Sequence, residues 1–224
     1  MTDDCDWVAR ELGYRFSDPA LLARALTHRS AAGQHNERLE YLGDAALSLV
    51  VAETLYARLP DAPEGHLSRL RASLVRRSAL AERARELGFP RRLRLGSGEL
   101  KSGGFRRASI LADALEAVLG AIYLDGGLAA LRPVVLGLYG ARLDELPAHE
   151  DLKDPKTLLQ ERLQARGLPL PVYRLQAVEG EDHQQYFTIS CEVEGMTADA
   201  VGSGSSRRTA EQAAAALMLA QFDE

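Results

Sequence analysis

The chain has 224 residues, of which 46% are hydrophobic, so it can build a substantial core and global disorder is excluded. Its formal net charge of −5 argues against nucleic-acid binding by bulk charge alone, so any such surface must be a local patch. Two distant cysteines, an acidic N-terminus without a signal-peptide pattern and the lack of a membrane-length apolar run predict a cytoplasmic protein with no membrane partner.

Helical patterns dominate the first two thirds of the chain. After a short N-terminal helix, a second helix is expected to begin at Pro19, the position that proline favours. Asn36 is predicted to cap a longer helix that runs to about Arg58. We expect this helix to dock by its apolar face, which comprises Leu39, Leu42, Ala46, Leu49 and Val50.

The same helix carries an acidic face. Glu37, Glu40 and Asp44 fall at i, i+3 and i+7, and no Lys or Arg stands three or four residues from any of them. Because like charges on one helix face are mutually destabilising, a positive charge is expected to offset them. A solvated acidic face is the alternative interpretation.

Two further helices are predicted, one beginning near Glu64 and one capped by Ser78 and ending at Leu87. Residues 91–107 then combine glycines with six basic side chains. Backbone amides and guanidinium groups both suit phosphate oxygens, so this stretch is either a solvated loop or a phosphate-contacting one.

The segment from Ile110 to Leu124 is apolar on every side except at Asp113 and Glu116. A helix that is apolar all round is buried, and a buried carboxylate must be paired, protonated or bound to a metal. Since the segment contains no basic residue, the two acids indicate a cation. Carboxylates without His or Cys select hard cations such as Mg²⁺ or Mn²⁺.

A turn at 125–127 and a helix to about Leu146 are expected to complete this part. Residues 146–154 have linker composition, so the two parts should move relative to each other. From Pro155 the pattern predicts a helix, strands over 172–177, 186–193 and 196–201, and a helix over 206–222. We therefore predict an α+β protein with an all-α domain (1–147), a linker (148–153) and an α-β-β-β-α domain (154–224).

The sequence from Asn36 to Asp44 resembles the signature of the ribonuclease III family, and Asp113 with Glu116 resembles that family's second acidic pair. The part from Asp154 onward resembles the double-stranded RNA-binding domain. The resemblance implies an endoribonuclease that cleaves double-stranded RNA and leaves 5′-phosphate and 3′-hydroxyl ends, in the processing of rRNA precursors, mRNA and other structured RNAs. It also implies a homodimer, since one acidic constellation per chain serves one strand of a duplex.

By this resemblance, Asp44 and Glu116 are the catalytic pair, and they bind two Mg²⁺ ions together with Glu40 and Asp113. Mn²⁺ can substitute. One ion would activate water and the other would stabilise the departing 3′-oxygen. Glu37 and Glu64 match acids outside the metal shell, or are surface or intersubunit carboxylates. The implied RNA contacts of the second domain are Thr157, Gln160, Glu161, His183, Arg207 and Arg208.

Two other functions are compatible with parts of this pattern. A protein that binds double-stranded RNA without cutting it would share the second domain, but it would not need the four acids. A helical carboxylate-bridged redox metalloprotein would require Glu-x-x-His repeats, and none occurs in the sequence.

Overall fold

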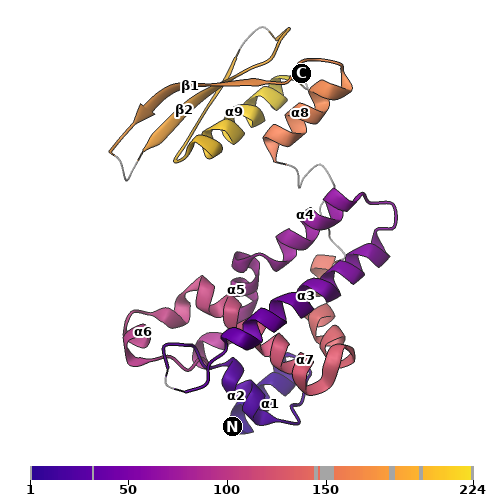
Figure 1. The fold of residues 1–224 in the computed structure, drawn as a ribbon, viewed down its shortest axis with the longest axis vertical. Helices are drawn as coiled ribbons and strands as arrows, with labels where there is room; N and C mark the ends of the chain where they lie inside the picture. The colour runs from indigo at the N-terminus through magenta and orange to yellow at the C-terminus, as the bar shows by residue number, and fades with distance from the viewer. Residues whose placement is uncertain are drawn as a thin grey trace. The chain divides into compact units, whose positions relative to one another are not determined.

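A computed structural model describes residues 2–31, 33–143, 146, 154–181, 185–196 and 199–222. The chain divides into two compact units, Met1–Pro147 and Ala148–Glu224 (Figure 1). Each unit is described by itself. The predicted linker, residues 148–153, lies outside the described residues.

The regular secondary structure of the first unit is helical in its described residues, as predicted. Asp18 caps the second helix by accepting a hydrogen bond from the Ala20 amide, with Pro19 as the first helical residue. Short 3₁₀ turns at Phe89–Arg91, Gly104–Arg106 and Gly140–Leu143 connect or end the helices. The α-helices are α1 (Thr2–Glu11), α2 (Pro19–Ala25), α3 (Glu37–Arg58), α4 (Glu64–Val75), α5 (Arg77–Glu86), α6 (Ser97–Lys101) and α7 (Ala108–Tyr139).

Helix α7 is the centre of this unit, and α3 and α5 make the most extensive contacts with it (Figure 1). By length and composition it could cross a membrane, and half of its most apolar 18-residue window is buried inside the unit. The predicted turn at 125–127 is a break within α7, where Gly127 has φ 72° and ψ −175°. Asp125 fixes this break by accepting hydrogen bonds from the Tyr14 hydroxyl (2.7 Å) and the Ser17 amide (2.8 Å).

Asn36 is the N-cap residue of α3, as predicted, although its side chain makes no cap hydrogen bond. Three other local predictions for this unit were wrong. Leu49 is 49% exposed, because it lies on a stripe of α3 that no described element of the chain covers. Helix α5 begins at Arg77 without a side-chain cap, so Ser78 does not cap it. Residues 91–107 are not simply a loop, since they contain α6 and a 3₁₀ turn.

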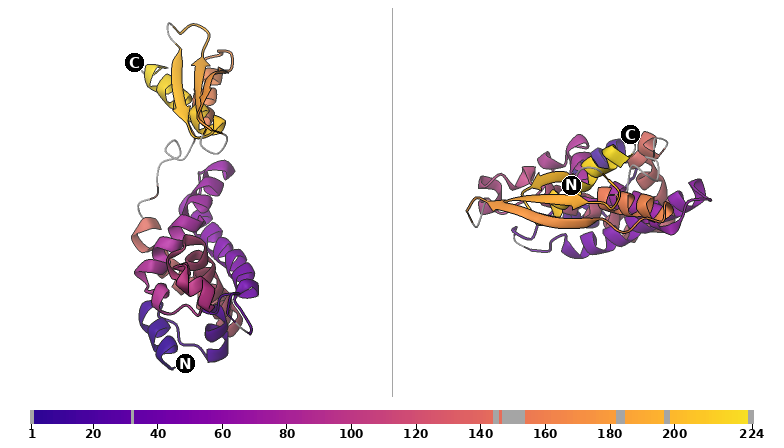
Figure 2. Two further views of the ribbon diagram at one scale, coloured as in Figure 1. Left: turned by 90° about the vertical axis from the view of Figure 1, so that its left-hand side faces the viewer. Right: turned by 90° about the horizontal axis from the view of Figure 1, so that it is seen from above.

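The second unit has the predicted α-β-β-β-α order. Its elements are α8 (Pro155–Ala165), β1 (Val172–Glu179), β2 (Tyr186–Glu192), β3 (Ala200–Gly204) and α9 (Arg207–Phe222). The strands form an antiparallel sheet in the order β1-β2-β3, and both helices pack on one face of it (Figure 2). A single core joins helices and sheet, and it includes Leu159, Leu163, Cys191, Ala214 and Met218.

The third strand begins four residues later than predicted. Gly195 has φ 89°, and the Met196 amide donates a hydrogen bond to the Val193 carbonyl, so a turn occupies the beginning of the predicted strand. Strand β3 then lies directly under α9, because a Cβ on Gly202 would come within 2.1 Å of the Ala214 nitrogen. Only glycine permits this close contact.

Candidate metal centre

The acidic pairs meet where α3 crosses α7. At this crossing the two backbones touch: a Cβ on Gly43 would lie 1.8 Å from the Glu116 carbonyl oxygen, and one on Gly120 would lie 2.1 Å from the Leu39 carbonyl oxygen. Gly43 precedes Asp44, and Gly120 is one helical turn after Glu116. The close contact therefore places the acids of α3 beside those of α7.

Three of the four predicted metal ligands converge tightly. One ligand oxygen from each of Glu40, Asp113 and Glu116 lies within 4.8 Å of the others, which is close enough to hold one metal ion. Asp44 is not part of this tight group, but it lines the same cavity of about 380 Å³. Tyr41, Ala112 and Arg77 complete the lining.

Burial and mutual repulsion raise the pKa values of the clustered acids. Desolvation is the largest cause of the rise in the pKa of Glu116 to about 8, followed by the charges of Asp44, Asp113 and Glu40. Desolvation, then Asp113, also raises the pKa of Glu40. Desolvation raises the pKa of Asp113, although Arg77 opposes it. In the metal-free protein, Glu116 is therefore largely protonated at neutral pH.

This donor set fits a divalent cation. Among the described residues, no Lys or Arg forms an ion pair within 4.0 Å with Glu40, Asp44, Asp113 or Glu116. A cation would supply the charge that these oxygens lack, and a set made only of carboxylates favours Mg²⁺ or Mn²⁺ over softer metals.

A second cavity of about 590 Å³ continues from the acid cluster and shares Glu40 and Asp113 with the first. Its other walls carry two ion pairs: Arg29 with Glu37 at 3.0 Å, and Arg107 with Glu99 at 2.8 Å. His28, Ser30, Asn36, Ser109 and Ile110 also line it. Arg29 and Arg107 are therefore partly neutralised by their carboxylate partners. A phosphate group of a ligand could displace either carboxylate from its arginine.

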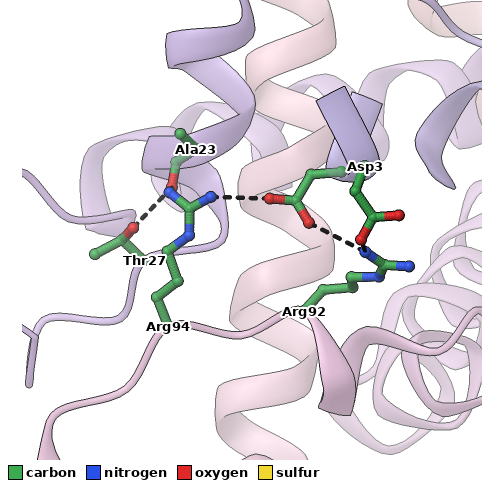
Figure 3. Close-up of polar contacts among 6 residues, drawn as sticks. Asp3, Ala23, Thr27, Arg92 and Arg94 are labelled. Atoms are coloured by element: carbon green, nitrogen blue, oxygen red, sulfur yellow. Dashed lines mark hydrogen bonds and ion pairs between the residues drawn. The ribbon is translucent and has the colours of Figure 1, made fainter. Parts of the chain in front are cut away.

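Ion pairs from α1 hold the segment that carries His28 and Arg29. The Arg94 guanidinium pairs with Asp4 at 2.8 Å and donates to the Ala23 carbonyl, while Arg92 pairs with Asp3 (Figure 3). The Arg94 backbone in turn bridges the chain around Thr27, donating to the Leu26 carbonyl and accepting from the His28 amide. The wall of the larger cavity is therefore fixed from outside the acid site.

The two secondary acids lie in different places. Glu37 lines the larger cavity, paired with Arg29. Glu64 begins α4 and accepts a hydrogen bond from the Ser68 hydroxyl at 2.6 Å. It lines a separate cavity beside Tyr56, near the end of α3 opposite to the acid pair, so within one chain it does not join the cluster.

Three residues that shape the site were not identified from the sequence: Gly43, Gly120 and Arg77. Gly43 and Gly120 carried a signal, since glycine inside a helix is unfavourable unless a close contact requires it. Arg77 carried none, because its neighbours are set by the packing of α5 on α7 and not by spacing along the chain.

In the second unit, the described residues among the predicted RNA contacts lie on α8 and in the first turn of α9. Arg207 and Arg208 are exposed in the first turn of α9, where the helix dipole favours phosphate. Gln160 and Glu161 are exposed on α8, and the Thr157 hydroxyl donates to Asp154 at 2.8 Å. His183 lies outside the described residues.

Polar contacts join the beginning of α8 to the second turn of α9. Gln212 of α9 donates to Asp154 at 2.7 Å, and Lys156 of α8 pairs with Glu211 at 2.6 Å. Because both links connect the beginning of α8 to the second turn of α9, they hold the two helices together near the predicted RNA contacts.

Comparisons with known proteins agree with this division of the chain. Residues 18–142 match a family model described as ribonuclease-III-like, and residues 155–222 match the double-stranded RNA binding motif. Ribonuclease 3 of Vibrio vulnificus (strain YJ016) is 55% identical over 222 residues, covering 99% of each chain. Ribonuclease 3 of Nitrosococcus oceani is 56% identical over 230 residues, covering 100% of this chain and 99% of its own.

A solved structure agrees for the first unit. The nuclease domain of ribonuclease III from Campylobacter jejuni, described as flexible in a region involved in dimer formation, superimposes with a TM-score of 0.60 at 39% identity. The match covers 63% of this chain and 99% of that one. The chain therefore belongs to the ribonuclease III family of endoribonucleases that act on double-stranded RNA.

Proposed function

We propose that this protein hydrolyses phosphodiester bonds of double-stranded RNA at the acid cluster in a divalent-metal-dependent reaction, leaving 5′-phosphate and 3′-hydroxyl ends. The observation that carries the proposal is the convergence of Glu40, Asp113 and Glu116 within 4.8 Å at a place where no described Lys or Arg pairs with them. The family and its helical nuclease unit support the same reaction.

In this proposal Glu40, Asp44, Asp113 and Glu116 hold Mg²⁺, with Mn²⁺ as a substitute, and Asp44 and Glu116 are the catalytic pair. The bound ions would supply an activated water for attack on phosphorus and stabilisation of the departing 3′-oxygen. The carboxylates bind and orient, and Glu116 gives up its proton when a cation takes the proton's place, since its pKa is about 8 in the free protein. Cation binding is therefore expected to strengthen as pH rises towards 8.

The second unit would deliver the duplex. We propose that Arg207 and Arg208 contact phosphates, and that Thr157, Gln160, Glu161 and His183 face the minor grooves. The exposure of both arginines at the first turn of α9 supports this role. The expected substrates are rRNA precursors, mRNA and other structured RNAs of the bacterial cytoplasm, since the similar ribonucleases described above come from bacteria.

The active form is proposed to be a homodimer. Helix α3 presents an exposed stripe that includes Tyr41 (82%), Leu49 (49%) and Tyr56 (76%), beside a cavity of about 640 Å³ between α3 and α4. Exposed apolar side chains aligned along one helix support the proposal that another protein covers this surface. Two copies related by a two-fold axis would present one acid cluster to each strand of a duplex.

The experiment incubates labelled duplex RNA with the full-length protein in Mg²⁺ and compares the wild type with Glu116→Gln. Glu82→Gln is the matched control, because Glu82 is an exposed acid of α5 that pairs with Arg142. We expect Glu116→Gln to lower the cleavage rate by roughly a thousandfold or more while duplex binding is retained. Cleavage by the wild type in EDTA, or undiminished cleavage by Glu116→Gln, would contradict the proposal; a wild type that only binds RNA would favour the non-cleaving alternative.

A further inference from the structure

The acid cluster has one basic neighbour whose role the family's acidic motifs do not describe. Arg77, the first residue of α5, lines the same cavity as Glu40, Asp44, Asp113 and Glu116. No other Lys or Arg of the described chain lines that cavity.

The position of Arg77 is fixed although its side chain is exposed. Ala79, Leu80, Ala81 and Ala84 are buried, and α5 packs extensively on α7, the helix that carries two of the acids. The chain turns sharply into α5 at Arg76, which has φ −60° and ψ 145°. The start of α5 is therefore held beside the acids by packing and not by a charge pair.

The Arg77 guanidinium is close to the acids but is not committed to any of them. It shares the lining of one cavity with Glu40, Asp113 and Glu116, so a ligand in that cavity can reach both the guanidinium and the acids. Among the described residues, no carboxylate lies within 4.0 Å of it as an ion-pair partner. With no described carboxylate as its partner, the guanidinium can donate to a ligand that enters the cavity.

We propose that Arg77 is a catalytic residue that binds a non-bridging oxygen of the phosphodiester held at the acid cluster. The inference rests on the proposed function. Once the carboxylates are engaged by divalent cations, the phosphate is the anion left in the cavity, and a guanidinium matches two phosphate oxygens with paired hydrogen bonds. The fixed positive charge would also stabilise the negative charge that develops on phosphorus oxygens as the bond to the 3′-oxygen breaks.

The test compares Arg77→Gln with Arg76→Gln in the full-length protein. Arg76 is the adjacent exposed arginine and lines none of the cavities described, so it matches the loss of charge without the proposed contact. Single-turnover cleavage of duplex RNA is measured at saturating protein in Mg²⁺. We expect Arg77→Gln to lower the rate about tenfold to a hundredfold, Arg76→Gln to change it less than about twofold, and Arg77→Lys to restore part of the loss.

Two further readouts separate contact with the substrate from a structural role. Mn²⁺ binding, followed by electron paramagnetic resonance, should be unchanged or tighter in Arg77→Gln, because a positive neighbour of the metal site is removed. Replacing one non-bridging oxygen of the cleaved linkage with sulfur should slow the wild type more than Arg77→Gln, because only the wild type has the guanidinium contact to lose.

Wild-type rates in Arg77→Gln would overturn the proposal. It would also be overturned by equal sulfur effects in both proteins, or by loss of Mn²⁺ binding together with activity in both Arg77→Gln and Arg77→Lys. Failure of the proposed function looks different, since the wild type would then cleave in EDTA or Glu116→Gln would cleave normally.

Discussion

The clustered acids of the nuclease unit and two acids of the RNA-binding unit experience opposite electrostatic environments. In the nuclease unit, desolvation followed by neighbouring acids raises the pKa values of Glu40 and Glu116. In the RNA-binding unit, a hydrogen bond from Lys156 is the largest cause that lowers the pKa of Glu211. Desolvation acts to raise the pKa of Asp154, but hydrogen bonds from Gln212 and Thr157 outweigh it.

The difference separates acids whose charge stabilises the fold from acids whose charge destabilises it and which are kept in place by the packing around them. Asp154 and Glu211 link α8 to α9 through hydrogen bonds, so their charged forms stabilise the RNA-binding unit. The clustered acids of the metal centre repel one another, so their charged forms destabilise the metal-free protein. Apolar packing of α3 on α7 must keep them together, and perturbed acids of this kind are typical of functional sites.

Breaking the helix crossing should have the largest effect. In Gly43→Ala the new Cβ would lie 1.8 Å from the Glu116 carbonyl oxygen, so α3 and α7 must separate. We expect a loss of about 4 kcal/mol or more in the free energy of unfolding, with loss of cleavage. Urea unfolding is followed by fluorescence of Trp7, the only tryptophan, which is buried in the nuclease unit.

Gly137→Ala is the matched control for this substitution. Gly137 is an exposed helical residue of α7, and a Cβ added to it would meet nothing within 4 Å, so alanine should stabilise α7 by roughly 0.5–1 kcal/mol. Equal effects of the two substitutions would show that the backbone contact at Gly43 does not hold the acid pairs together.

The acid pairs could be predicted from the sequence because their spacing and the apolar surroundings of Asp113 and Glu116 are local properties of single helices. The burial of the first half of α7 was predicted correctly from its apolar sequence. The same kind of argument failed for Leu49, which was predicted to be buried and is 49% exposed. An amphipathic pattern gives the apolar residues of a helix, but it does not show which of them another element of the chain covers.

The features that could not be predicted from the sequence depend on contacts between residues far apart in the chain. Arg77 reaches the acids because α5 packs on α7, and nothing in the spacing of the chain fixes that packing. Strand β3 begins late because the chain turns at Gly195. The alternation of apolar residues starts at this turn, before the strand itself begins. Alternation predicts that a strand exists better than it predicts where the strand begins.

Neutralising Glu116 should stabilise the metal-free nuclease unit. The folded-state pKa is about 8 and the ordinary value is 4.5, so the folded protein binds more protons than the unfolded protein between these pH values. Wild-type stability therefore falls as pH rises through this window. We expect Glu116→Gln to gain roughly 2–4 kcal/mol relative to the wild type in EDTA at pH 9, after allowance for solvent screening, and almost nothing at pH 4.5.

Trp7 fluorescence during urea unfolding at several pH values measures this gain. Addition of Mg²⁺ should reverse the order, since the wild type has the full ligand set and is stabilised by binding, whereas Glu116→Gln is stabilised less. A variant that is less stable than the wild type in EDTA at every pH would mean that the acids of the cluster do not repel one another.

In the RNA-binding unit, neutralising an acid should lower the free energy of unfolding instead of raising it. Glu211→Gln removes the ion pair with Lys156 at 2.6 Å and should destabilise this unit by about 1 kcal/mol at neutral pH. Because the pKa of Glu211 is lowered, its contribution is present above the ordinary value of 4.5 and is lost as pH falls through the folded-state pKa. Amide hydrogen exchange of α9 in the full-length protein measures it, with the exposed Glu179→Gln on β1 as the control.

The smallest effects should come from the two arginines at the start of α9. Arg207 lies 3.3 Å from Glu211, whereas no ion pair within 4.0 Å involves Arg208 among the described residues. Arg208 therefore keeps its full charge for phosphate, and we expect Arg208→Gln to weaken duplex binding about threefold and Arg207→Gln by less. Binding is titrated at several salt concentrations, where the salt dependence should fall by about one released ion for Arg208→Gln.

Cleavage at saturating protein should be unchanged in both variants, because these side chains bind the duplex without touching the bond that is cut. A lower saturating rate in either variant would mean that the RNA-binding unit also positions the cleaved strand.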